Sequence, residues 1–353
     1  MNTRQPLLVL ALCAITSAAI AQNTRIVLQG TGAPQVFTAI EDALAAAQPN
    51  DKLYFSGGSH TTQPGGITVD MPLHWIGAGI SPDSSNVTAT TTLTTPDLSS
   101  NFIFTTGAGG SSFTGIKFAP AGGNTFSGAY FAFGNDGTDD APQDMVFERC
   151  LFQCYLGLGR EEIGSASSGT FNECIFTGIV AGVGPSATTF TRCIFASQIT
   201  TFRPSGLLIE HSAFLLYGLG DCQNALVKNS AFYPNDVAGG QTTATWNNCL
   251  FGGPETTANV SGTNNIFDQI SSEIFVDQTD SYFQWTDDLH LSVGSPGINA
   301  ADDGTDIGIY GSSSPAKVGA VPYNPHYRQA TIATSTNPNG DLPVNIRVAA
   351  QPN

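Results

Sequence analysis

Two loops of the chain hold aspartates at a spacing that suits a divalent cation. The word "DGTD" occurs within Asn135–Asp144 and again within Asp302–Asp306. Calcium takes about six to eight oxygen ligands, which carboxylates clustered around a glycine turn can provide. Because Asp-Gly is also an ordinary turn, and neither loop follows the EF-hand pattern, calcium binding and a plain turn both stay open. The candidate ligands are Asp136, Asp139, Asp140, Asp302, Asp303 and Asp306.

Five further titratable side chains lie between apolar segments in the middle of the chain. They are Arg160, Glu162, Arg203, Asp221 and Asp236. General acid–base catalysis needs titratable groups within hydrogen-bond reach, and a glycosidase needs two carboxylates about 5–10 Å apart. Glu162 could pair with Asp221 or Asp236, and Arg203 and Asp221 fall in adjacent coils and could meet. The neighbouring positions are mostly Gly, Thr, Ser and Leu, which offer few titratable groups for acid–base catalysis.

A repeated eight-residue phrase determines where these side chains can lie. Its fourth position recurs at spacings of 24, 19, 19, 18 and 19 residues, and its sixth position is always Phe. The copies are "FERCLFQC", "FNECIFTG", "FTRCIFAS", "IEHSAFLL", "VKNSAFYP" and "WNNCLFGG". Degenerate copies flank them, one at Phe113–Phe118 and one that ends at Phe267. A repeat of roughly twenty residues indicates a solenoid.

The composition of the repeat favours strands over helices. Gly, Thr, Ser, Asn and β-branched residues dominate it, and no leucine-rich consensus is present. In a parallel β-helix each coil is one turn of stacked strands, so equivalent residues lie about 4.8 Å apart. The first position then ends one strand, two residues turn the corner, and Cys-x-Phe starts the next strand with its middle residue outward. This register predicts that Phe176, Phe195 and Phe214 are buried in one stack.

The third position of the phrase forms a corner column with its own chemistry. Its members are Arg149, Glu173, Arg192, His211, Asn229 and Asn248. Asn suits a corner that needs a left-handed backbone. Arg149, Glu173 and Arg192 alternate in sign, which predicts a surface ion ladder, with a ligand-binding strip as the alternative.

The cysteines and the net charge limit the possible functions. Cys150, Cys174 and Cys193 share an inward column whose geometry is poor for disulfides, so we expect them to be reduced, whereas Cys154 and Cys222 lie off the column. Without Arg4, 11 basic residues stand against 28 acidic ones, a net charge of −17. Such a chain repels nucleic acid and anionic membranes, so a nucleic-acid partner is not expected.

The first 21 residues are typical of a signal peptide. Arg4 precedes an apolar stretch, and "AIA" at Ala19–Ala21 is a small-x-small cleavage signal before Gln22. No later stretch reaches transmembrane length. We therefore expect a secreted protein, either extracellular or at the cell surface.

The corner phrase resembles that of the right-handed parallel β-helix superfamily, the pectate-lyase-like fold. Val36–His60, Pro72–Gly79 and Asp288–Gly311 are similar to the opening, the second coil and the closing segment of secreted bacterial members. The resemblance implies an all-β solenoid over residues 22–311, followed by a strand-rich cap or attachment segment over residues 312–353. It does not specify an activity, because the superfamily holds lyases, hydrolases and adhesins, and none of its catalytic motifs is recognisable in this sequence.

Both ends of the solenoid have candidate caps. Thr38-x-x-Glu41 matches a capping box and opens a short amphipathic helix that could plug the first coil. In the tail, "QATIATST" and "LPVNIRVAA" alternate like strands on either side of the turn "NPNGD", which predicts a β-hairpin.

Two functions follow from these features. The first is a non-catalytic scaffold or adhesive protein whose long flat face could bind a polysaccharide or a cell-surface component. The alternative is a polysaccharide lyase or glycoside hydrolase. A lyase would use Arg160 or Arg203 as its base, with Asp221, Asp236 or a calcium ion holding the uronate.

Overall fold

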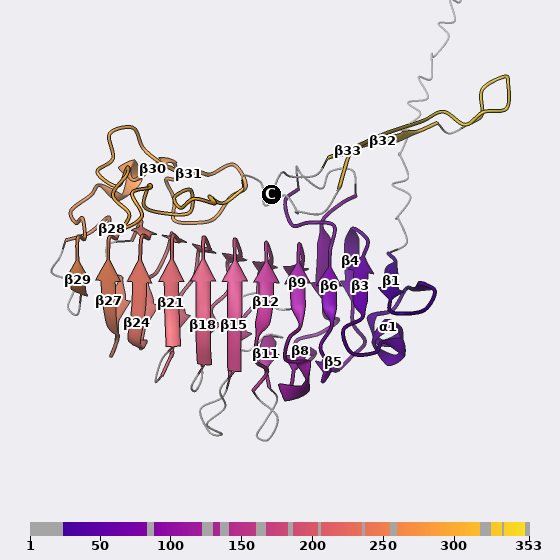
Figure 1. Cartoon of the computed structure of the whole chain (residues 1–353), viewed down its shortest axis with the longest axis horizontal. Coiled ribbons are helices and arrows are strands. Elements are labelled where there is room, and N and C mark those ends of the chain that lie inside the picture. Colours follow the sequence, from indigo (N-terminus) through magenta and orange to yellow (C-terminus); the bar gives the residue numbers. More distant parts are fainter. Residues whose placement is uncertain are drawn as a thin grey trace, which may run out of the picture.

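Three long sheets form the sides of a solenoid in the computed structural model (Figure 1). The structure describes residues 24–82, 88–121, 130–134, 141–159, 167–182, 186–203, 206–234, 237–254, 260–317, 326–333 and 335–349. Each full coil passes through the nine-stranded, the eight-stranded and the twelve-stranded sheet in turn, and strands of successive coils pair in parallel. The all-β parallel solenoid expected from the repeat is therefore present.

The twelve-stranded sheet is the broadest side and begins with an antiparallel edge. In spatial order its strands are β2 (Gln35–Phe37), β1 (Ile26–Gln29), β3 (Lys52–Phe55), β6 (His74–Ile76), β9 (Ser112–Thr114), β12 (Met145–Glu148), β15 (Ser167–Asn172), β18 (Ser186–Thr191), β21 (Gly206–Glu210), β24 (Gln223–Lys228), β27 (Thr243–Asn247) and β29 (Val260–Thr263). Strand β1 pairs antiparallel with both β2 and β3, and every later pair is parallel.

The other two sides are built from shorter strands. The nine-stranded sheet holds β4 (Gly58–Thr61), β7 (Thr91–Thr94), β10 (Lys117–Phe118), β13 (Leu151–Phe152), β16 (Ile175–Phe176), β19 (Ile194–Phe195), β22 (Ala213–Phe214), β25 (Ala231–Phe232) and β28 (Leu250–Phe251). The eight-stranded sheet holds β5 (Gly66–Val69), β8 (Asn101–Phe104), β11 (Phe131–Phe133), β14 (Leu156–Gly157), β17 (Val180–Ala181), β20 (Ile199–Thr200), β23 (Leu219–Gly220) and β26 (Ala238–Gly239).

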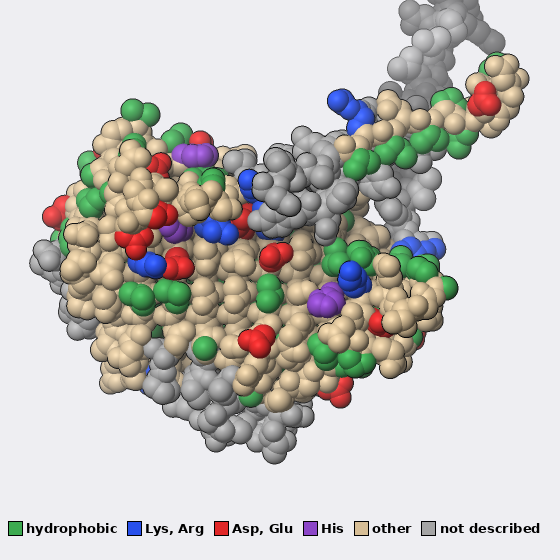
Figure 2. Space-filling model, in the orientation of Figure 1, with side chains coloured by type: hydrophobic (Ala, Val, Ile, Leu, Met, Phe, Trp, Pro, Cys, Tyr) green, Lys and Arg blue, Asp and Glu red, His purple; other side chains and the backbone are tan. Residues whose placement is uncertain are grey.

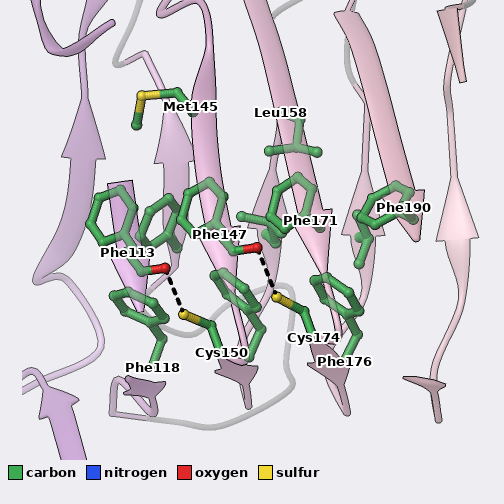
Figure 3. Close-up of a cluster of buried hydrophobic side chains, with 14 of the residues drawn as sticks. Phe113, Phe118, Met145, Phe147, Cys150, Leu158, Phe171, Cys174, Phe176 and Phe190 are labelled. Atoms are coloured by element: carbon green, nitrogen blue, oxygen red, sulfur yellow. Dashed lines mark hydrogen bonds between the residues drawn. The ribbon is translucent and has the colours of Figure 1, made fainter. Parts of the chain in front are cut away.

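The core is made of two aromatic stacks that run along the solenoid. Phe176, Phe195 and Phe214 are fully buried and paired in register, with ring centroids 5.1 and 4.7 Å apart, so the predicted stack is confirmed. A second stack comes from the first position of the phrase, where Phe147 and Phe171 lie 4.6 Å apart (Figure 3). The two stacks meet edge to face, an arrangement that aromatic quadrupoles favour.

The corner between the twelve- and nine-stranded sheets requires a left-handed residue in every coil. The six members of the corner column have φ between +45° and +54°. The preceding degenerate copy has Gly115 at the same place, with φ of +67°. The left-handed corner predicted from the asparagines is confirmed, and it extends to His211 and to Arg149, Glu173 and Arg192, whose residue types adopt this conformation less readily than Asn or His.

The helix α1 (Ile40–Ala46) forms without the predicted capping box. Its N-cap is Ala39, which makes no side-chain cap hydrogen bond, and Glu41 Oε1 instead accepts a hydrogen bond from the backbone N–H of Gln63 at 2.6 Å. The helix buries Ile40 and Ala43 and contacts β1 and β2. Two single-turn 3-10 helices, Thr106–Ala108 and Ser271–Glu273, complete the helical elements of the described residues, and no helix among them is long and apolar enough to cross a membrane.

After the last coil the chain folds back over the outside of the solenoid. This return segment, residues 267–317, contains the antiparallel pair β30 (Phe275–Asp277) and β31 (Asp288–Leu291). It covers the outward side chains of the nine-stranded sheet: Ala213, Ala231 and Leu250 pack in one buried cluster with residues such as Ile274, Phe275 and Ile307. A further antiparallel pair, β32 (His326–Ile332) and β33 (Val344–Ala349), projects from the body (Figure 1).

Candidate functional site

The first half of the corner column is a buried ion ladder. Arg149 Nε lies 2.9 Å from Glu173 Oε2, and Arg192 Nε lies 3.7 Å from Glu173 Oε1. The Arg149 and Glu173 side chains are only 1% and 5% exposed, so the expected surface ladder is wrong. At Glu173 the return segment lies directly against the ladder, because the Lys317 backbone N–H donates a hydrogen bond to Glu173 Oε2 at 3.2 Å. These charges therefore hold the return segment in place instead of forming an exposed ligand strip.

The second half of the corner column binds the same segment through polar side chains. Asn229 Nδ2 donates a hydrogen bond to Asp302 Oδ1 at 2.6 Å, and Asp302 N donates one back to Asn229 Oδ1 at 3.0 Å. Asn248 Nδ2 donates to the carbonyl oxygen of Ala300 at 3.0 Å. His211 Nε2 lies 3.4 Å from Asp303 Oδ2, and burial lowers the pKa of His211 although this carboxylate opposes the shift.

The second "DGTD" loop uses its carboxylates to shape its own turn. Asp303 Oδ1 accepts hydrogen bonds from Thr305 Oγ1 at 2.6 Å and Thr305 N at 3.0 Å, which lower the pKa of Asp303. Asp306 Oδ1 accepts a hydrogen bond from the backbone N–H of Asn299 at 2.9 Å. No group of three or more His, Cys, Asp or Glu side chains within the described ranges is placed to hold a metal ion. Calcium binding by Asp302, Asp303 and Asp306 stays a prediction.

Several candidate residues lie outside the described residues. They are the loop aspartates Asp136, Asp139 and Asp140, and the acid–base candidates Arg160, Glu162 and Asp236.

The structure does bring Arg203 and Asp221 together. They follow β20 and β23 at the corner that leads into the twelve-stranded sheet, with Arg203 Nη2 3.2 Å from Asp221 Oδ1 and Arg203 Nε donating to the carbonyl oxygen of Asp221 at 3.2 Å. Asp221 Oδ1 also accepts a hydrogen bond from the backbone N–H of Gln241 at 2.8 Å. The two side chains are 37% and 39% exposed, so a solute can reach them. Their hydrogen bonds tie three successive coils together.

The outer face of the twelve-stranded sheet is broad and carries few charges (Figure 2). From β9 to β29 one outward row pairs residue to residue across eight strands without a titratable group. The row consists of Ser112, Val146, Thr170, Thr189, Leu208, Leu226, Thr245 and Ser261. The charges beside it stand at the edge of the sheet, where Lys228 Nζ lies 2.6 Å from Glu210 Oε1.

A hollow of about 420 Å³ opens where the return segment leaves the last coil. Leu250, Ile274 and Phe275 line it and are buried, whereas the lining residues Ile270, Val276 and Val293 are strongly exposed. The polar side chains that line this hollow are Gln269, Ser272, Glu273, Ser292 and Ser295, and Ser292 Oγ donates a hydrogen bond to the carbonyl oxygen of Phe275 at 2.8 Å.

The cysteines that the structure describes are buried and take no part in an exposed site. All six in the described ranges are free and buried, as predicted for Cys150, Cys174 and Cys193. Their thiols donate to backbone carbonyls of the neighbouring coil, as Cys174 Sγ does to Phe147 O at 3.5 Å (Figure 3). Burial raises the pKa of Cys222 to about 12, which suppresses the reactive thiolate.

No protein-family model matches this sequence, and no curated protein sequence matches it.

The sequence analysis did not predict that the return segment covers the nine-stranded sheet, although the fifth position of the repeated phrase indicates a covered face. The fifth position points outward, yet its residues are Leu151, Ile175, Ile194, Ala213, Ala231 and Leu250. An outward row that is apolar in every coil indicates a covered face.

Proposed function

We propose that the protein is a secreted, non-catalytic scaffold with the right-handed parallel β-helix fold of the pectate-lyase-like superfamily. Parallel crossover connections are right-handed in about 98% of cases, which supports the handedness. In this proposal α1 closes the first coil, and the β32–β33 pair serves as an attachment module. The scaffold presents the outer face of its twelve-stranded sheet to an extracellular polysaccharide or a cell-surface component.

One observation supports this proposal most strongly: the outward row from Ser112 to Ser261 contains hydroxyl and aliphatic side chains but no titratable group. Residues along the row repeat at about 4.8 Å, so a long polymer can lie across many equivalent contacts. Hydroxyls can donate and accept hydrogen bonds, as a glycan requires. The lack of charge also suits a neutral ligand, because a chain of net charge −16 repels polyanions.

The second candidate is a polysaccharide lyase or glycoside hydrolase centred on Arg203 and Asp221. It is favoured by the direct contact of these side chains at an accessible corner. Against it, Asp221 Oδ1 is already engaged by Arg203 and Gln241, and an arginine is almost never deprotonated near neutral pH. In such an enzyme a calcium ion could supply the positive charge that holds the uronate of the substrate.

Co-sedimentation with insoluble polysaccharides, combined with a cleavage screen, tests both candidates. If the protein is a scaffold, we expect binding without new reducing ends and without a rise in absorbance at 235 nm, where the unsaturated product of a lyase absorbs. Thr189→Arg, at the centre of the outward row, should abolish binding. Thr200→Arg makes the same change on the eight-stranded sheet and should leave binding intact. Cleavage that Arg203→Ala abolishes would instead establish the enzyme.

A further inference from the structure

The projecting β32–β33 hairpin has an apolar stripe with no partner in the described chain. Val344, Ile346 and Val348 occupy alternate positions of β33 and therefore share one face. These side chains are 51%, 49% and 57% exposed, and hydrophobic groups are visible along the hairpin in Figure 2. A two-stranded hairpin by itself is marginally stable in water. The stripe therefore needs a surface that covers it.

The return segment carries a matching surface at the other end of the molecule. Ile270, Val276 and Val293 are 60%, 54% and 101% exposed around the 420 Å³ hollow, whose lining also includes the buried Leu250 and Phe275. Apolar side chains grouped around a hollow are typical of a docking site. Strand β30, which holds Val276, has only β31 as a partner in its sheet.

The two segments carry net charges of opposite sign. Residues 267–311 contain nine acidic residues and no Lys or Arg. These are Asp268, Glu273, Asp277, Asp280, Asp287, Asp288, Asp302, Asp303 and Asp306. Residues 326–349 contain two arginines and one aspartate, so the hairpin has the opposite net sign. Arg347 lies on the face of β33 opposite the apolar stripe, so its charge contributes to the long-range attraction between the two segments and not to the apolar contact itself.

We propose that the hairpin of one copy docks its apolar stripe over the hollow of a second copy. The hairpin and the β30–β31 pair lie over opposite halves of the solenoid (Figure 1). The chain also leaves the return segment at Lys317, which is held against Glu173, several coils away from Leu250 at the hollow. In this arrangement the hairpin does not cover the hollow of its own chain, so we take the occupant to be a neighbouring molecule. Since each copy has one hairpin and one hollow, the contact is head-to-tail and builds open chains or rings.

Cysteine cross-linking of the full chain tests the contact directly. Mixing a Val293→Cys chain with an Ile346→Cys chain and adding a short bis-maleimide should give a product of twice the chain mass. The matched control is Asn345→Cys, an exposed neighbour on the other face of β33, which should give no product with Val293→Cys. The native cysteines do not interfere, because all six that the structure describes are buried.

Sedimentation gives the second readout. The unmodified chain should grow in mass with concentration, and Ile346→Asp should weaken this association by about tenfold or more, because a negative charge enters the apolar contact beside an acidic segment. The proposal would be overturned if sedimentation showed a monomer at every concentration and the mixed cysteine variants gave no cross-linked product. A cross-link that forms only within one chain carrying both Val293→Cys and Ile346→Cys would also overturn it, because the hairpin would then cover its own hollow.

Discussion

Replacing Phe195 by Ala should destabilise the protein more than any change at the surface. Its ring is fully buried, with stacked neighbours at 5.1 and 4.7 Å and an edge contact with Phe190 at 5.3 Å. Losing the buried ring removes about 1.5–3 kcal/mol of burial free energy, and each stacked contact adds about 0.5–1.5 kcal/mol. Because strands above and below fix the cavity, the total should be about 3–5 kcal/mol.

The position within the stack provides the control. Phe267 ends the same stack, is only partly buried, and has one stacked neighbour, Phe251, at 5.0 Å. Phe267→Ala should therefore cost about 1–2 kcal/mol. Urea unfolding followed by the fluorescence of Trp75 and Trp246, both fully buried, measures both variants. If Phe195→Ala cost less than Phe267→Ala, the reasoning that stacking along the solenoid determines stability would be refuted.

Four further measurements test other parts of the structure. Glu173→Ala should cost about 3–5 kcal/mol in urea unfolding, because it leaves buried Arg149 without its carboxylate, while Glu148→Ala at the sheet edge should change stability by less than about 0.5 kcal/mol. Titration of the thiols without reductant should find all of them only after unfolding, and a rapid reaction of the native protein at pH 8 would contradict the burial that raises the pKa of Cys154 and Cys249 to about 12. Burial lowers the folded-state pKa of His211 below its unfolded value of 6.5, so the contribution of His211 to stability is present above pH 6.5 and is lost as the pH falls towards the folded pKa. His211→Asn should flatten this part of the profile of stability against pH. An unchanged profile would contradict the lowered pKa. If the aspartate loops bind calcium, millimolar calcium should raise the melting temperature relative to EDTA, and identical curves would show that the loops are plain turns.

The return segment shows why outward residues of a repeat are harder to interpret than inward ones. Ala231 and Leu250 point away from the solenoid core, yet both are completely buried beneath this segment. The repeat alone fixes only which side of the strand they occupy. Whether that side meets water depends on residues 267–317, which do not share the period of the repeat.

The repeat was enough to predict the solenoid, its register and its left-handed corners, because each coil must place matching side chains against the next one. That constraint is local and periodic, so Phe195 and Asn229 could be assigned without coordinates. The burial of Arg149 and Glu173 followed only from the tertiary structure, in which the backbone of Lys317, 144 residues after Glu173, donates a hydrogen bond to the Glu173 carboxylate. The same holds for Arg203 and Asp221: their spacing allowed a contact, but only the folded coils show that both groups are tied to neighbouring corners. Contacts that recur in every coil can be predicted from the repeat, because each repeat contains the same residues. The return segment contacts the solenoid only once, so no repeating pattern in the sequence indicates where it lies.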